Sequence, residues 1–157
     1  MPAFRLTAEP GQQELTITHE FHAPAARVFQ AMTDASLLPH WWGPRKYATI
    51  VDQLEPRTGG RWRFINRGHD GVDHGFHGTF HLVDAPRRIV QTFEYEGAPG
   101  HVSLESLTLE ERDGKTLLTA HSVFQSVQDR DEMMHGDDME SGARETYARL
   151  EELLAKG

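Results

Sequence analysis

Histidines are the side chains of this sequence best suited to acid–base chemistry, because a histidine changes its charge near neutral pH. The chain has ten of them. His19 and His121 stand in segments that alternate apolar and polar residues, as β-strands do. Beside a carboxyl group such as Glu105, either histidine would complete a pair that donates and accepts a proton. The simpler interpretation is that both are hydrogen-bonded residues of a sheet, and the sequence leaves the two interpretations open.

The spacing of the histidines does not indicate a metal site. His77 and His81 share one face of a predicted strand, but they stand roughly 13 Å apart, which is too far for two ligands of one ion. The chain has no cysteine, which excludes disulfides and thiolate metal sites. It also lacks the motifs of a phosphate loop, a nucleophile elbow and a metalloprotease helix. We therefore predict no metal ion and no cofactor, and assign no catalytic residue.

The composition limits the class of protein. The 157 residues suffice for one domain with a sizeable core, and 38% of them are hydrophobic. A formal net charge of −8 opposes binding to a phosphate backbone, so we expect no nucleic-acid partner. No segment is apolar over the roughly 18 residues that a membrane span needs. We accordingly expect no membrane partner and a cytoplasmic location.

Seven segments have the alternation and the flanking turn residues that are typical of β-strands. The first places Leu15, Ile17 and Phe21 on one face. Short connections such as Asp113-Gly114 favour an antiparallel sheet. The predicted strands are residues 14–22, 47–55, 61–66, 74–84, 89–95, 102–111 and 116–124. Residues 1–13 are predicted to be a loose arm, followed by a single domain over residues 14–157.

Helical patterns flank these strands. Pro24 and Pro39 suit the first turns of two short helices directly after the first strand. A long C-terminal helix is predicted by apolar residues that recur every three or four positions: Met139, Ala143, Thr146, Leu150 and Leu153. Gly142 stands beside this apolar stripe, and we expect it to mark a close approach of the helix to the sheet. A curved sheet around this helix would leave a cavity between them.

Several motifs, in this order and spacing, resemble the START/Bet v 1-like superfamily, also called SRPBCC. They include residues 15–18, Ala23-Pro24, Gly59 to Phe64 and, as the most specific, Trp41-Trp42-Gly43-Pro44. Within that superfamily, residues 14–155 resemble the homologues of the activator of heat-shock protein 90 ATPase. The resemblance implies an α+β helix-grip fold: a curved seven-stranded antiparallel sheet around a long C-terminal helix, with two short helices after strand one.

The chain departs from this family pattern at two positions. Many relatives have arginine where His19 stands and glutamate where Leu82 is predicted. Any binding role of that pair therefore does not transfer to this chain. The eukaryotic co-chaperones have an additional N-terminal domain that this sequence does not show, so the resemblance by itself implies no chaperone activity.

The residues on the predicted inner faces are candidates both for core packing and for the lining of a ligand cavity. Aromatic rings supply apolar area, and a few polar groups would orient a ligand. The candidate ligand-binding residues are His19, Trp41, Trp42, Trp62, Phe64, Asn66, Phe76, Phe80, Leu82, Phe93, Tyr95, Glu105, His121, Met139 and Ala143.

Three functional hypotheses follow. The first is a protein that binds or sequesters a small apolar molecule. The second is an enzyme of the cyclase or hydrolase kind, which the superfamily also includes, with a cavity histidine and a carboxylate as its proton-transfer pair. The third is a chaperone-associated or other protein-partner module, which would expose an apolar patch on the outer face of the sheet. The sequence leaves a homodimer open as well.

Overall fold

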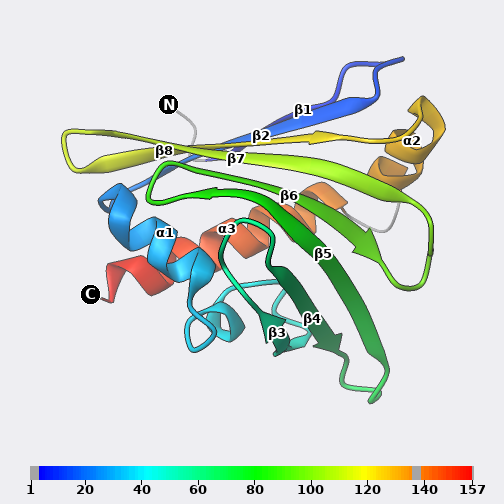
Figure 1. The fold of residues 1–157 in the computed structure, drawn as a ribbon, viewed down its shortest axis with the longest axis horizontal. Coiled ribbons are helices and arrows are strands. Elements are labelled where there is room, and N and C mark those ends of the chain that lie inside the picture. Colours follow the sequence, from blue (N-terminus) through cyan, green and yellow to red (C-terminus); the bar gives the residue numbers. More distant parts are fainter. Residues whose placement is uncertain (1–3, 136–138, 157) are drawn as a thin grey trace.

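Residues 4–135 and 139–156, which the computed structural model describes, form one antiparallel sheet of eight strands that curves around a long helix (Figure 1). The order of the strands across the sheet is β1-β2-β8-β7-β6-β5-β4-β3. The strands are β1 (Phe4–Thr7), β2 (Glu14–Phe21), β3 (Ala48–Leu54), β4 (Arg61–Arg67), β5 (Asp73–Asp84), β6 (Arg88–Tyr95), β7 (Val102–Arg112) and β8 (Lys115–Val123).

The antiparallel α+β architecture confirms the prediction, but the predicted number of seven strands is wrong for the described residues. The additional strand is β1, which lies in the segment expected to be a loose arm. In it, Phe4 pairs with His19 and Leu6 with Ile17. Phe4 is buried, and its ring lies 5.8 Å from that of Tyr147 on the C-terminal helix. Four residues with one buried ring carry too little alternation for the sequence to reveal a strand.

The helices are α1 (Ala25–Thr33), the 3-10 helix η1 (Leu38–His40), α2 (Val127–His135) and α3 (Met139–Ala155). Helices α1 and η1 are the two short helices predicted after the first long strand, and α3 is the predicted C-terminal helix. Pro39 stands in the first turn of η1, where a missing N–H costs little. Helix α2 is a separate element that the apolar pattern did not resolve, because its charged residues give it no apolar stripe.

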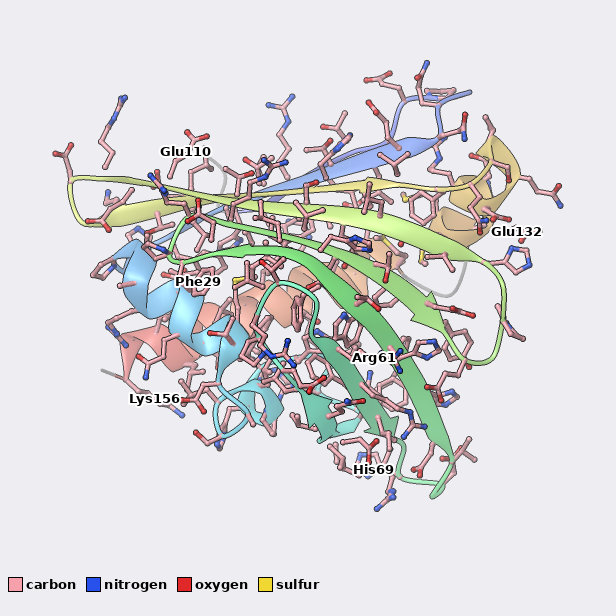
Figure 2. All side chains as sticks on the ribbon, in the orientation of Figure 1. Phe29, Arg61, His69, Glu110, Glu132 and Lys156 are labelled. Carbon is pink, nitrogen blue, oxygen red and sulfur yellow. The ribbon has the colours of Figure 1, made fainter. Side chains whose placement is uncertain are left out.

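The core lies on the concave side of the sheet, against α1 and α3. Phe21, Val28, Leu118 and Leu150 are fully buried there and come from β2, α1, β8 and α3. Each such side chain contributes about 1.5–3 kcal/mol of hydrophobic stabilisation. Glu110, Glu132 and Lys156 extend from the outside of the fold, whereas Phe29 of α1 is buried (Figure 2).

Side-chain hydrogen bonds fix the position of α3 relative to α1 and to the turn after η1. Arg149 donates to the carbonyl oxygens of Gly43 and His40, at 2.6 and 3.1 Å. Arg27 of α1 donates to the carbonyl oxygen of Leu154 at 2.8 Å, which satisfies one of the free carbonyls at the end of the helix. These bonds join α3 to α1 and to the turn after η1.

Gly142 does not mark an approach of α3 to the sheet, so that expectation is wrong. A Cβ atom added at Gly142 would have Pro44 Cγ as its neighbour, at an ordinary contact distance of 3.5 Å. Pro44 belongs to the turn that follows η1. The helix leaves room between itself and the sheet at this level, and a cavity occupies that room.

Candidate functional site

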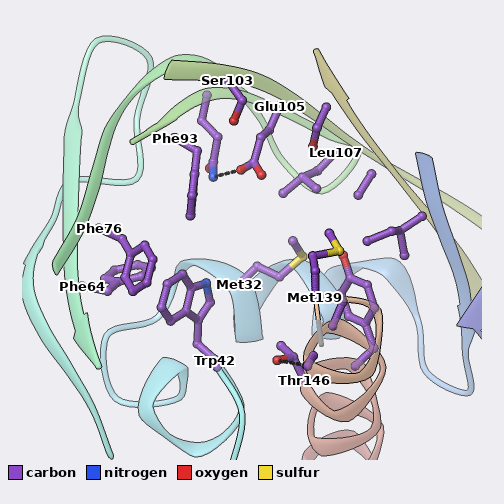
Figure 3. A pocket seen from close by; sticks show the side chains of 18 of the residues that line it. Met32, Trp42, Phe64, Phe76, Phe93, Ser103, Glu105, Leu107, Met139 and Thr146 are labelled. Carbon is purple, nitrogen blue, oxygen red and sulfur yellow. Dashed lines mark hydrogen bonds between the residues drawn. The ribbon is translucent and has the colours of Figure 1, made fainter. Parts of the chain in front are cut away.

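A cavity of about 400 Å³ lies between the concave face of the sheet and α3 (Figure 3). This volume is within the range of about 300–1,000 Å³ that is usual for small-molecule sites. Its walls come from strands β2 and β4 to β8, from the Trp41–Pro44 turn, and from the sides of α1, α2 and α3 that face the sheet. Met32, Met133 and Met139 line it from the three helices, and methionine adapts to ligands of varied shape.

Five aromatic rings gather at one end of the cavity: Trp42, Trp62, Phe64, Phe76 and Phe93. The Trp42 ring meets those of Phe64 and Phe76 edge to face, with centroids 5.1 and 5.4 Å apart. Phe93 lies 5.5 Å from Phe76 and 5.9 Å from Trp62. Such tilted pairs are the favourable arrangement for aromatic rings. This end therefore offers a well-packed apolar wall for a flat ligand.

The Trp41–Pro44 turn is fixed to the elements around it. Trp41 Nε1 donates to the carbonyl oxygen of Ala31 in α1 at 2.9 Å. Gly43 has a φ of 85°, and a Cβ atom there would lie 3.0 Å from Asn66 Nδ2. A glycine is therefore required at this position on both conformational and steric grounds. The Asn66 amide accepts a hydrogen bond from the Thr49 hydroxyl at 3.0 Å, which places it beneath the turn.

Polar side chains form a row across the sheet wall of the cavity. Gln91 of β6, Glu105 of β7 and Ser122 of β8 stand directly opposite one another in the register of these strands. Gln91 Nε2 donates to Glu105 Oε1 at 2.9 Å, and Ser122 lines the cavity beside Glu105 on the other adjacent strand. Ser103, two residues before Glu105, faces the cavity from the same strand. Figure 3 shows Ser103 and Glu105 entering the cavity from the sheet.

Burial favours the protonated form of the two acidic groups in the cavity. It raises the pKa of Glu105, because a carboxylate in the cavity loses hydration; the hydrogen bond from Gln91 and the nearby Ser122 hydroxyl partly oppose this rise. Burial also raises the pKa of the Tyr147 phenol on α3, and the nearby Glu105 adds to that rise. The phenol therefore stays protonated at neutral pH and can donate a hydrogen bond into the cavity.

Eleven of the predicted residues line the cavity: Trp41, Trp42, Trp62, Phe64, Asn66, Phe76, Phe80, Phe93, Glu105, Met139 and Ala143. Inward-facing positions on β4, β5, β6 and β7, the Trp41–Pro44 turn and one face of α3 bring them together. Whether any of them binds a ligand stays a prediction. The structure places the other four predicted residues elsewhere.

His121 and Leu82 point away from the cavity. On β8, Ala120 and Ser122 face inward, so His121 between them faces outward and lies 3.1 Å from Glu14 Oε2. On β5, the register shifts between Phe80 and Leu82. This bulge interrupts the alternation that predicted a shared face, because an extra residue turns the following side chains over.

His19 and Tyr95 lie beyond the two ends of the cavity. The ring of His19 is buried between Phe21, at 4.3 Å, and Tyr147, at 5.7 Å. Burial lowers the pKa of His19, although Glu151 at 3.6 Å from its Nε2 acts in the opposite direction. The Tyr95 hydroxyl bonds His74 Nδ1 at 3.0 Å, on the far side of Phe76.

Five polar residues of the cavity were not among the predicted ligand-binding residues: Gln91, Ser103, Ser122, Thr146 and Tyr147. Two of them interrupt a run of inward-facing apolar residues: Gln91 lies between Ile89 and Phe93, and Ser122 lies between Ala120 and Phe124. A polar residue at an inward position was therefore the signal that could have identified them. Tyr147 stands one helical turn after Ala143 and so faces the same way.

Residues 22–155 match the family described as Activator of Hsp90 ATPase homolog 1-like protein. The chain is similar to the solved structure of a protein from Rhodobacter sphaeroides, with 26% identity, coverage of 95% of this chain and 97% of that one, and a TM-score of 0.86. A protein from Mycobacterium smegmatis also has 26% identity, with coverage of 98% and 97% and a TM-score of 0.86.

A third solved structure has the same fold. The AHSA1 protein from Silicibacter pomeroyi has 22% identity over 91% of this chain and 98% of its own, with a TM-score of 0.73. Curated proteins gave no significant match. None of the helices in the described part of the chain has the length and apolar character that a membrane crossing requires. The match over residues 22–155 shows that this chain belongs to the Activator of Hsp90 ATPase homolog 1-like family.

Proposed function

We propose that this chain binds a small, largely apolar molecule in the cavity between the sheet and α3. The observation that carries the proposal is the cavity of about 400 Å³, whose lining is chiefly aromatic and aliphatic with a few polar groups among them. Burial of apolar surface there supplies roughly 25 cal/mol per Å², and the polar groups orient the ligand. Membership of the family suggests a ligand-binding or an Hsp90-associated role.

The lining supports binding rather than acid–base catalysis. A hydrolase or cyclase of the expected kind would place a histidine beside a carboxyl group in the cavity. The group that hydrogen-bonds Glu105 is instead the amide of Gln91, and its neighbour on the other strand is Ser122; neither takes up a proton near neutral pH. His19 and His121, the two candidate bases, lie outside the lining of the described cavity.

The outer face of the sheet supports small-molecule binding over a protein-partner role. Arg63 forms two hydrogen bonds of 2.8 Å with the Glu96 carboxylate. His77 Nδ1 lies 2.9 Å from the same carboxylate, and Asp52 lies 3.3 Å from Arg63. Ion pairs of this density occupy the part of the surface where a partner module would present an apolar patch.

Filling the cavity tests the proposal. N-phenyl-1-naphthylamine, a neutral apolar dye that fluoresces when it is buried, is titrated into the wild type and into Ala143→Phe. Ala143 lines the cavity, so the added ring should occupy it and weaken dye binding about tenfold or more. Ala148→Phe, at an exposed position of the same helix, is the matched control and should bind like the wild type.

Thermal unfolding monitored by circular dichroism establishes that both variants are folded. Absence of dye binding to the wild type would refute the proposal. Equal binding by wild type and a folded Ala143→Phe would refute it too, since the dye would then occupy another part of the surface.

A further inference from the structure

The cavity has an acidic group and no basic group in its lining. Among the described lining residues, Glu105 is the one carboxylic acid, and none is a lysine, an arginine or a histidine. Tyr147 is the other titratable group that faces Glu105, and its phenol stays protonated. Any charge that the lining presents to a ligand is therefore negative.

The neighbours of Glu105 hold it in place without neutralising it. Gln91 on one adjacent strand donates a hydrogen bond to its carboxyl, and Ser122 stands opposite Glu105 on the other strand. Both neighbours are uncharged, so a positive partner for the carboxylate has to come from the ligand. In Figure 3, Glu105 projects from the sheet into the open space, with Trp42 and Met32 across from it.

Two further features favour a cation in this space. The aromatic rings at one end include Phe93, which enters the cavity on the next strand beside Glu105 (Figure 3). The faces of such rings attract ammonium groups through their negative quadrupole. The formal net charge of −8 also gives the whole chain a field that attracts cations and repels anions.

We propose that the ligand of this cavity is an apolar molecule with one basic nitrogen, and that the carboxylate of Glu105 anchors its ammonium group. The apolar body of the ligand packs against the aromatic rings, and the hydrogen bond from Gln91 positions Glu105 toward the nitrogen. This inference rests on the proposed function, because it specifies the ligand of the same cavity.

The inference predicts a ranking of ligands that share a body and differ in charge. A carboxylate ligand would bring a second negative group into a space without a cation, whereas an ammonium ligand pairs with Glu105. Burial raises the pKa of Glu105, so part of the ammonium affinity is used to ionise the carboxyl. Binding of an amine should therefore release protons, in proportion to the protonated fraction of Glu105 in the free protein.

Three naphthalene compounds test the ranking in competition with N-phenyl-1-naphthylamine at pH 7: 2-naphthylmethylamine, 2-ethylnaphthalene and 2-naphthoate. The amine should compete about tenfold or more better than the neutral hydrocarbon, and the carboxylate should compete least. Glu105→Gln keeps the shape of the side chain and should abolish the preference for the amine. Its affinity for the hydrocarbon should remain within about twofold of the wild type.

Glu110→Gln is the matched control, because it changes the net charge equally at an exposed position of the same strand and should keep the amine preference. If Glu105→Gln does not fold, Glu105→Asp withdraws the carboxylate by one methylene and should reduce the preference. Dye binding without an amine preference, or a preference that survives Glu105→Gln, overturns this inference and leaves the proposed function intact. Failure of the dye to bind the wild type overturns the proposed function itself.

Discussion

A single methyl group at Gly78 should destabilise the sheet strongly. A Cβ atom at this position of β5 would lie 1.9 Å from the carbonyl oxygen of Thr92 and 2.6 Å from Trp62 Nε1. Both distances are far below a van der Waals contact. The Thr92 oxygen belongs to the backbone of β6, and Trp62 is 2% exposed, so neither can move aside without disturbing its surroundings. Overpacking of this kind costs about 1–3 kcal/mol, and we expect Gly78→Ala to reach or exceed the upper value.

The sign of this effect makes the experiment decisive. Replacing a strand glycine by alanine ordinarily stabilises a protein by roughly 0.5–1 kcal/mol, because the unfolded chain loses conformational freedom. Urea denaturation of the wild type and Gly78→Ala gives the difference in unfolding free energy. The two curves are compared with the same slope of unfolding free energy against urea concentration. A loss under about 0.5 kcal/mol would show that β5 and β6 separate easily, and would refute the packing argument.

Two further predictions concern α3 and the strand beneath it. Gly142→Ala should raise the unfolding free energy by about 0.5–1 kcal/mol in the same assay, because the methyl group meets Pro44 at an ordinary distance and removes a helical glycine; a decrease would contradict this. His19→Phe should reduce the loss of stability between pH 7 and pH 5. Burial lowers the pKa of His19, so the unfolded chain binds the proton first, and stability falls as the pH drops below about 6.5. Equal pH dependence of the wild type and variant would contradict this assignment.

Most of the strands could be predicted because alternation and turn residues agree along their length. In β4, Trp62 and Phe64 face the core while Arg61 and Arg63 face outward, as their order in the sequence indicates. The bulge between Phe80 and Leu82 could not be predicted in this way. No glycine or proline marks it, and the apolar Leu82 continues the pattern that the bulge interrupts.

Strand β1 could not be predicted from the sequence for a different reason. Its position depends on a contact distant in the sequence, since Arg144 of α3 lies 4.6 Å from the ring of Phe4. An edge strand of four residues is not specified by its own residues. It forms because β2 offers an open edge and because α3 covers its one buried ring.

The polar row in the cavity shows which part of a site the sequence can specify. Asp113 and Gly114 both have positive φ, at 55° and 78°, as a two-residue hairpin turn requires. This turn sets Arg112 opposite Lys115, and counting back along both strands places Glu105 opposite Ser122. That pair could therefore be predicted from the turn alone. The position of Gln91, the third member, could not be predicted, because a longer loop connects β6 to β7 and its length fixes no register. The geometry of that loop in the folded protein places Gln91 opposite Glu105. The hydrogen bond that positions the proposed anchor of the ligand is thus a property of the folded sheet.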